Sequence, residues 1–114
     1  MTHDVFEGPA IVIGYAYRLQ IEAEAPIFED GAYASHVRSE VTSRDVLANL
    51  STANGGLVRI SDVVLEINIP ASATGQMAQG SVMLDVVRTD VTPDQQMSFV
   101  LTIPVVPAIT RGLP

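Results

Sequence analysis

Three residue types are missing from this 114-residue sequence: cysteine, tryptophan and lysine. Without cysteine the chain can form neither disulfide bonds nor thiolate metal sites. Six arginines stand against 13 acidic residues, which gives a formal net charge of −7. Binding to nucleic acid requires a cationic surface that contacts the phosphate backbone. We therefore expect no nucleic-acid partner.

Long apolar runs are also missing. Hydrophobic residues make up 47% of the chain, but none of their runs approaches the roughly 18 to 20 residues of a membrane-spanning helix. We expect a soluble protein with no membrane partner. The amino-terminal residues MTHDVFEGP lack the basic region of a secretory signal, which predicts synthesis in a cytoplasm and no use of the general export pathway.

The stretch 62–90 contains the clearest pattern in the chain. Val63, Leu65, Ile67 and Ile69 alternate with more polar residues, which is typical of a strand with one buried face. Pro70 ends this strand, and ten small or polar residues follow before alternation resumes at Val82, Leu84 and Val86. Such a gap is too long for a tight hairpin. We expect the two strands to lie in different sheets, joined by a short helical corner at residues 71–79 with Met77 pointing inward.

Further strands are predicted on both sides of this stretch. They cover residues 10–13, 15–25, 32–41, 46–51, 57–60 and 97–103. In the second of them Tyr15, Tyr17, Leu19 and Ile21 share the face expected to be buried. Asn54-Gly55-Gly56 predicts a hairpin in which residues 57–60 return antiparallel to residues 46–50, because Asn-Gly tolerates the left-handed backbone of a tight hairpin turn.

Short strands at spacings near ten residues, with scarcely any helix, indicate an all-β fold. We predict a single domain over residues 1–114: an antiparallel, immunoglobulin-like β-sandwich of about eight short strands. It has an N-terminal arm (1–9) and a proline-containing C-terminal tail (104–114). A small up-and-down barrel is the alternative architecture.

Few residues suggest chemistry. The histidines, His3 and His36, stand in no metal-like spacing, and no serine lies in a G-x-S-x-G motif. The acid pair Glu22/Glu24 is expected on a solvated strand face. Glu29/Asp30 and Asp90 with Asp94 could contribute to a calcium loop, but neither segment has the spaced ligands of an EF-hand. We therefore predict no enzyme activity, no metal, no cofactor and no small-molecule substrate. An enzyme would need a pocket that combines His36 with several carboxylates.

The two ends of the chain are candidates for contact with a partner. Phe6 is an aromatic residue in a polar arm, where it either docks on a neighbour or covers an open end of the sandwich. Pro104 and Pro107 interrupt main-chain donation, so the last strand is expected to lie at an edge or to leave the sheet there. The candidate partner-binding residues are Phe6, Pro104, Val105, Val106, Pro107 and Ile109.

Several of these segments together resemble the N-terminal β-sandwich of phage upper baseplate proteins. The segments are GAYASHVR (31–38), LEINIPA (65–71) with Thr74, Gly80 through Leu84-Asp85-Val86, and residues 100–111. The resemblance covers roughly residues 17–111. Longer members of that family continue into a coiled coil and receptor-binding parts, whereas this sequence stops at Pro114. Receptor binding is therefore expected on another polypeptide.

The resemblance implies a virion structural protein, a non-enzymatic adaptor in the tail, baseplate or host-recognition apparatus. Its partners would be other virion proteins and copies of itself in a ring, since a ring repeats each weak contact many times. A head-tail connector and a capsid decoration protein are alternatives within the same class. From another class, the alternative is a small acidic binding module that inhibits a host factor.

Overall fold

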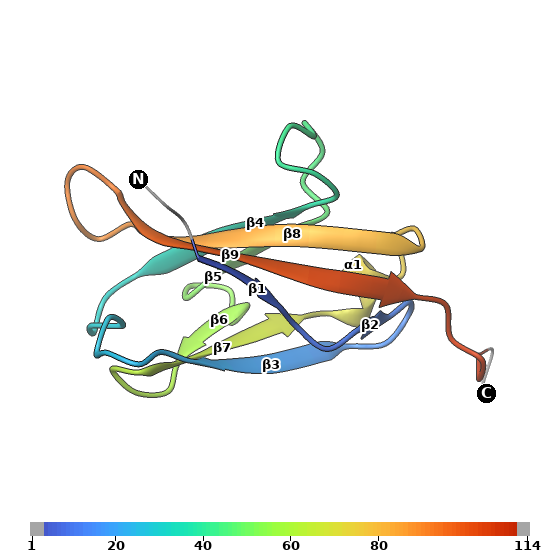
Figure 1. Ribbon diagram of the computed structural model, residues 1–114, viewed down its shortest axis with the longest axis horizontal. Helices are drawn as coiled ribbons and strands as arrows, with labels where there is room; N and C mark the ends of the chain where they lie inside the picture. Colours follow the sequence, from blue (N-terminus) through green and yellow to red (C-terminus); the bar gives the residue numbers. More distant parts are fainter. Residues whose placement is uncertain (1–3, 112–114) are drawn as a thin grey trace.

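Two β-sheets pack face to face in the computed structural model, which describes residues 4–111 (Figure 1). The described chain contains nine strands and one short helix. The elements are β1 (Asp4–Glu7), β2 (Ile11–Val12), β3 (Tyr17–Glu22), β4 (Tyr33–Arg38), β5 (Ala48–Ser51), β6 (Leu57–Arg59), β7 (Val64–Ile69), α1 (Ala71–Thr74), β8 (Gly80–Arg88) and β9 (Gln95–Val106). In the described part, no helix is long and apolar enough to cross a membrane.

The strand order is that of an immunoglobulin-like sandwich. One sheet has the order β1-β9-β8-β4-β5 with β2 also paired to β9, and the other has the order β3-β7-β6. In the immunoglobulin scheme the second sheet corresponds to strands B, E and D, and β4, β8 and β9 correspond to C, F and G. β5 takes the place that variable-type domains add beside strand C. The predicted all-β sandwich is therefore confirmed.

The amino-terminal segment differs from the predicted arm. Residues 4–7 form β1, which pairs in parallel with residues 99–102 of β9, and β2 pairs in parallel with residues 105–106 of the same strand. Two parallel pairs thus complete an otherwise antiparallel sheet. The sequence did not reveal β1, because four residues are too few to show strand alternation and the paired residues of β9 lie almost a hundred positions away. Residues 1–3 of the predicted arm, including His3, lie outside the described residues.

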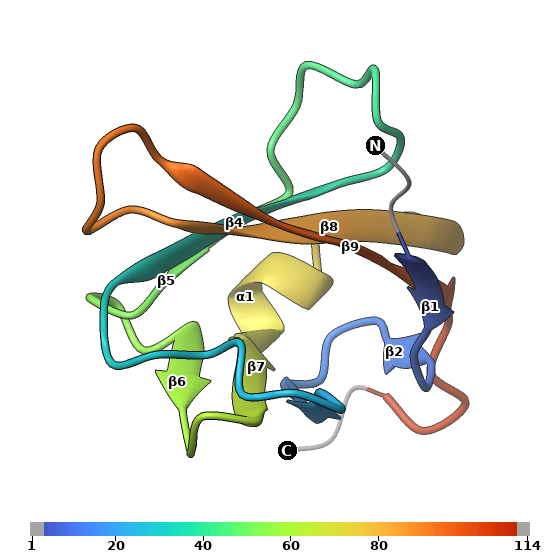
Figure 2. The ribbon, with the colours of Figure 1, turned by 60° about the vertical axis from the view of Figure 1, so that its left-hand side comes forward.

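The corner between β7 and β8 is confirmed. β7 belongs to the three-stranded sheet and β8 to the larger one, and α1 begins directly after Pro70. Figure 2 shows α1 between the two sheets. Met77 is buried as expected, and the fully buried Thr74 hydroxyl donates to the Tyr15 carbonyl at 2.8 Å. The corner therefore fills one end of the core and fixes the turn that precedes β3.

The hairpin predicted at Asn54-Gly55-Gly56 is wrong. β5 pairs with β4 in the larger sheet, whereas β6 pairs with β7 in the smaller one. The Asn54 Oδ1 atom accepts hydrogen bonds from the amides of Ser51 and Gly56, and its Nδ2 atom donates to the Asn49 carbonyl. Gly55 takes a positive φ of 80°. The turn chemistry was recognised, but the turn carries the chain from one sheet to the other.

Alternating side chains of both sheets form the core. The predicted inward residues of β7, β8 and β9 are all buried; they are Leu65, Ile67, Ile69, Val82, Leu84, Val86, Phe99, Leu101 and Ile103. Phe28, from the connection between β3 and β4, lies edge-on to the rings of Tyr33 and Phe99. A continuous apolar layer between the sheets is the main source of stability in such a sandwich.

β9 is longer than predicted. It continues through Pro104 to Val106, so the tail begins at Pro107 rather than at residue 104. Pro104 lies opposite Ser81 of β8 and, on its other side, in the interval where β1 has ended and β2 has not begun. A proline is tolerated here because no strand runs continuously along that edge.

Candidate partner-binding surfaces

The structure spreads the predicted partner-binding residues over the edge, the core and the surface. Phe6 is 52% exposed at the edge of the larger sheet, where the register places it on the same face as the buried Leu101. Pro104 is half-buried, and Val105 is buried in the core with 1% exposure. The other exposed members are Val106, Pro107 and Ile109.

Exposed apolar side chains gather where β9 leaves the sheet. Val106 faces Val12 across the parallel pair of β2 and β9, and both are partly exposed. Ile109 follows with 98% exposure. The Tyr15 hydroxyl donates to the Thr110 carbonyl at 2.7 Å, which brings its ring beside the tail. We call Val12, Tyr15, Val106 and Ile109 the end patch.

Val12 and Tyr15 were missed as surface residues. Tyr15 was expected on the buried face of a strand, but it lies in the turn before β3 begins at Tyr17 and is 41% exposed. Strand alternation does not extend into that turn. Val12 becomes part of this surface because it pairs with Val106, which is distant in sequence. The local sequence pattern around Val12 does not indicate that pairing.

The end patch lies among three segments that contain no acidic residue. Residues 8–17, 67–84 and 101–111 run into this end, and Arg111 is the one charged residue among them (Figure 1). Acidic residues concentrate in the loops at the opposite end: Glu24, Glu29, Asp30, Asp62, Asp90 and Asp94. The sandwich is therefore electrostatically asymmetric along its strands.

At the acidic end, Arg88 binds two carboxylates. Its guanidinium donates to both oxygens of Asp90, at 2.7 and 3.1 Å, and to Glu29 at 3.1 Å. These hydrogen bonds lower the pKa of Asp90 and raise that of Arg88. The Tyr33 hydroxyl donates to the Glu29 carbonyl at 2.6 Å, and burial raises its pKa. The cluster connects the β3–β4 loop to the end of β8 and therefore stabilises the fold at this end.

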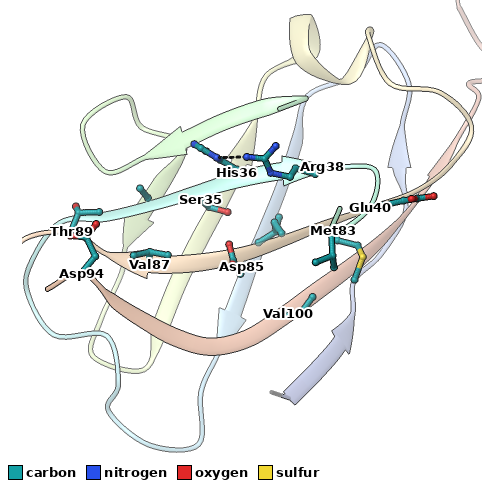
Figure 3. Close-up of a pocket in the computed structure, with 13 residues that line it drawn as sticks. Ser35, His36, Arg38, Glu40, Met83, Asp85, Val87, Thr89, Asp94 and Val100 are labelled. Carbon is teal, nitrogen blue, oxygen red and sulfur yellow. Dashed lines mark hydrogen bonds between the residues drawn. The ribbon is translucent and has the colours of Figure 1, made fainter. Parts of the chain in front are cut away.

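A groove lies on the outward face of the larger sheet (Figure 3). It has a volume of about 520 Å³ and crosses β4, β8 and β9 between the β4–β5 loop and the β8–β9 loop. Figure 2 shows the β4–β5 loop rising from the side of the sheet that faces away from β3, β6 and β7. We call this cavity the outer groove.

The outer groove combines a mainly apolar lining with carboxylates. Ala34, Met83, Val87 and Val100 are its half-buried nonpolar residues, and its acidic residues are Glu40, Asp85 and Asp94. The Arg38 guanidinium is already engaged: it donates to the carbonyls of Ser43 and Arg44, each at 3.0 Å, and lies 3.1 Å from His36 Nδ1 (Figure 3). Arg38 thus supports the β4–β5 loop. The accessible charges of the groove are mainly negative.

His36 and three carboxylates do line one cavity, the arrangement that an enzyme would need. The hydrogen bond that the structure shows for the His36 ring, however, is with the cationic Arg38, whereas a general base is normally oriented by a carboxylate. Asp85 accepts from the Gln96 side chain at 2.9 Å. Across residues 4–111, no group of three or more His, Asp or Glu residues is placed to hold a metal ion.

A second cavity of about 740 Å³ lies between β3, β7 and the turn that follows β5. Two of its polar side chains, Asn54 and Asn68, form hydrogen bonds within the protein. Asn54 holds the turn, and Asn68 donates to the Gly55 carbonyl and to Glu66. These contacts give the Asn54 and Asn68 side chains a structural role.

The chain matches no protein-family model and no curated protein.

Proposed function

We propose that the protein is a structural adaptor of a phage tail or baseplate, which acts by binding other proteins. The end patch carries this proposal. It places exposed aliphatic and aromatic side chains among segments that carry no acidic residue, in an otherwise acidic molecule. Charge is depleted and aromatic residues are enriched at the centres of protein interfaces, so this end suits contact with a protein.

The fold and the sequence resemblance support the same function. An immunoglobulin-like sandwich is a rigid body with loops and edges at both ends, and function on such folds depends on the surface and not on the fold. The resemblance to phage baseplate sandwiches suggests the assembly. Neighbouring virion proteins are the partners that we propose, and the virion is the proposed location.

Particle composition tests the proposal. Mass spectrometry of purified phage particles should detect this protein together with the tail proteins encoded beside it. A Val106→Asp variant should fold, as judged by circular dichroism, but be lost from the particles. Val58→Asp is the matched control, because Val58 is a strand valine of equal exposure (36% against 37%) on the other sheet. Absence of the wild-type protein from particles that contain the flanking tail proteins would refute the proposal.

A further inference from the structure

We propose that copies of this chain join head to tail, with the segment from Pro107 to Arg111 of one copy lying in the outer groove of the next. This goes beyond the proposed function, because it names a second copy as the occupant of the groove. It does not depend on the phage assignment.

The first argument is the state of the tail. Ala108 is buried, whereas the next side chain, Ile109, is 98% exposed. The Tyr15 hydroxyl holds the Thr110 carbonyl, and Arg111 donates to the Ala108 carbonyl. These contacts anchor the segment to its own domain while Ile109 projects into water. Transfer of such an exposed aliphatic side chain from water to an apolar site is favourable in free energy.

The second argument is charge. Arg111 is the single charged residue of the segments 8–17, 67–84 and 101–111, and Glu40, Asp85 and Asp94 line the groove. Residues 109 and 110 form a bend in the single copy, so the proposal requires the segment to extend as it binds. In an extended segment, side chains two residues apart point to the same side. Ile109 and Arg111 therefore enter the groove together, Ile109 toward Met83 and Val100 and Arg111 toward the carboxylates. Arg111 gives up its contact with Ala108 in exchange for these anionic partners.

The third argument is geometry. The tail leaves the sandwich at the end of β9, whereas the groove lies on the outward face of β4, β8 and β9 (Figures 1 and 3). Two different surfaces make a heterologous contact, which generates a ring where the rotation closes and a filament where it does not. A five-residue segment buries little area, so each contact is weak, and repetition in an assembly strengthens it.

Complementary mixing of two variants tests the inference. Ile109→Asp blocks the tail, and Ala34→Arg blocks the groove by adding bulk and a cation on its floor. By analytical ultracentrifugation, the average mass of the wild type should rise from one copy as concentration increases from micromolar to millimolar, and each variant alone should stay monomeric. An equimolar mixture should form a dimer and stop there, because only one tail and one groove remain intact. Val58→Asp should associate like the wild type.

A wild type that stays monomeric to millimolar concentration would overturn the inference. So would an Ile109→Asp variant that still associates, or a mixture that forms no dimer. Should a variant unfold, a labelled peptide of sequence PVVPAITRGLP provides the same test by fluorescence anisotropy with wild-type protein. It should bind at least roughly tenfold more tightly than its Ile109→Asp counterpart, and equal or absent binding refutes the proposal. Since these measurements use purified protein, they are independent of particle composition.

Discussion

Arg88 and Asp90 form a two-point contact in which Nε donates to Oδ1 at 2.7 Å and Nη2 donates to Oδ2 at 3.1 Å. Such paired, charge-assisted hydrogen bonds are stronger and more directional than single ones. A third arm of the same guanidinium reaches Glu29. The contact therefore joins the end of β8 to the loop before β4, two segments separated by about sixty residues.

The Arg88 contact predicts how stability changes in acid. The hydrogen bonds from Arg88 lower the pKa of Asp90 below its ordinary value of 3.8. A lowered folded-state pKa means that the stabilisation is complete above the ordinary pKa and is lost as pH falls through the folded value. Asp90→Asn should therefore be less stable than the wild type near neutral pH, and the difference should shrink toward about pH 3. Urea unfolding at both pH values measures this.

Arg88→Gln provides the control for that prediction. This substitution removes the donor of the same hydrogen bonds instead of their acceptor. It should therefore reduce the change of unfolding free energy between neutral and acidic pH in a similar way. A wild type and an Asp90→Asn variant whose unfolding free energies run parallel across the whole pH range would contradict the assignment.

Gly31 should tolerate a side chain only when Asp90 is absent. A Cβ atom at residue 31 would lie 2.6 and 2.8 Å from the two carboxylate oxygens of Asp90, closer than atoms can approach. Gly31→Ala must therefore displace Asp90 from Arg88, and we expect a loss of about 1 to 2 kcal/mol. In an Asp90→Ala background the same substitution should cost much less. Thermal unfolding of the four proteins measures the coupling, and additive losses would contradict it.

The corner between the sheets could be predicted because its signals are local. Alternation at Leu65, Ile67 and Ile69 indicated the strand, Pro70 marked its end, and the long polar gap argued against a hairpin. Each of these features lies within a few residues of the structure that it determines. The same holds for the inward side chains of β8 and β9, where the two-residue period decides which face is buried.

The turn at Asn54-Gly55 shows where local patterns become insufficient. Asn-Gly favours a tight turn, but the turn alone does not determine whether the next strand pairs with the preceding one. Here β5 pairs with β4 and β6 pairs with β7, so the two strands that flank the turn do not pair with each other. Strand pairing is a property of the whole sandwich, and this also explains why β1 was missed.

Asn54 should be important for this crossing between sheets. Its side chain makes three hydrogen bonds, two as acceptor and one as donor. Asn54→Ala removes all three and leaves main-chain groups of the turn without partners, for which we expect a loss of about 2 to 3 kcal/mol. Asn54→Asp keeps the acceptors and loses only the donor, so it should cost less. Urea denaturation ranks the variants; an equal loss in both would show that the donor alone matters.

The candidate surfaces were less predictable than the core. The tail residues Val106 and Ile109 were predicted as candidate partner contacts because prolines and chain position mark the end of a strand, and both side chains are exposed. The outer groove was not identified, since Ala34, Met83 and Val100 come from three strands that meet only in the folded sheet. A local pattern shows which face a side chain takes, but not which distant side chains share that face.

Two buried hydroxyls should respond to removal in opposite ways. The Ser35 Oγ atom is buried in the core and has no hydrogen-bond partner among residues 4–111, whereas the buried Thr74 hydroxyl donates to the Tyr15 carbonyl. An unpaired buried polar group costs free energy. Ser35→Ala should therefore be neutral or stabilise by up to about 1 kcal/mol, and Thr74→Ala should destabilise by about 1 to 3 kcal/mol. Equal losses in thermal unfolding would contradict this distinction.

Tyr17 should make the protein sensitive to alkali. Its hydroxyl donates to the Pro9 carbonyl at 2.7 Å, and burial raises its pKa to about 12. Because the unfolded phenol ionises near its ordinary pKa of 10.0, the stabilisation by neutral Tyr17 is complete below that pH and is lost as pH rises toward the folded value. Tyr17→Phe loses a hydrogen bond worth about 1 kcal/mol at neutral pH but should decline less steeply in alkali. Denaturant unfolding near neutral pH and at about pH 11 tests this, and parallel curves for the two proteins would rule it out.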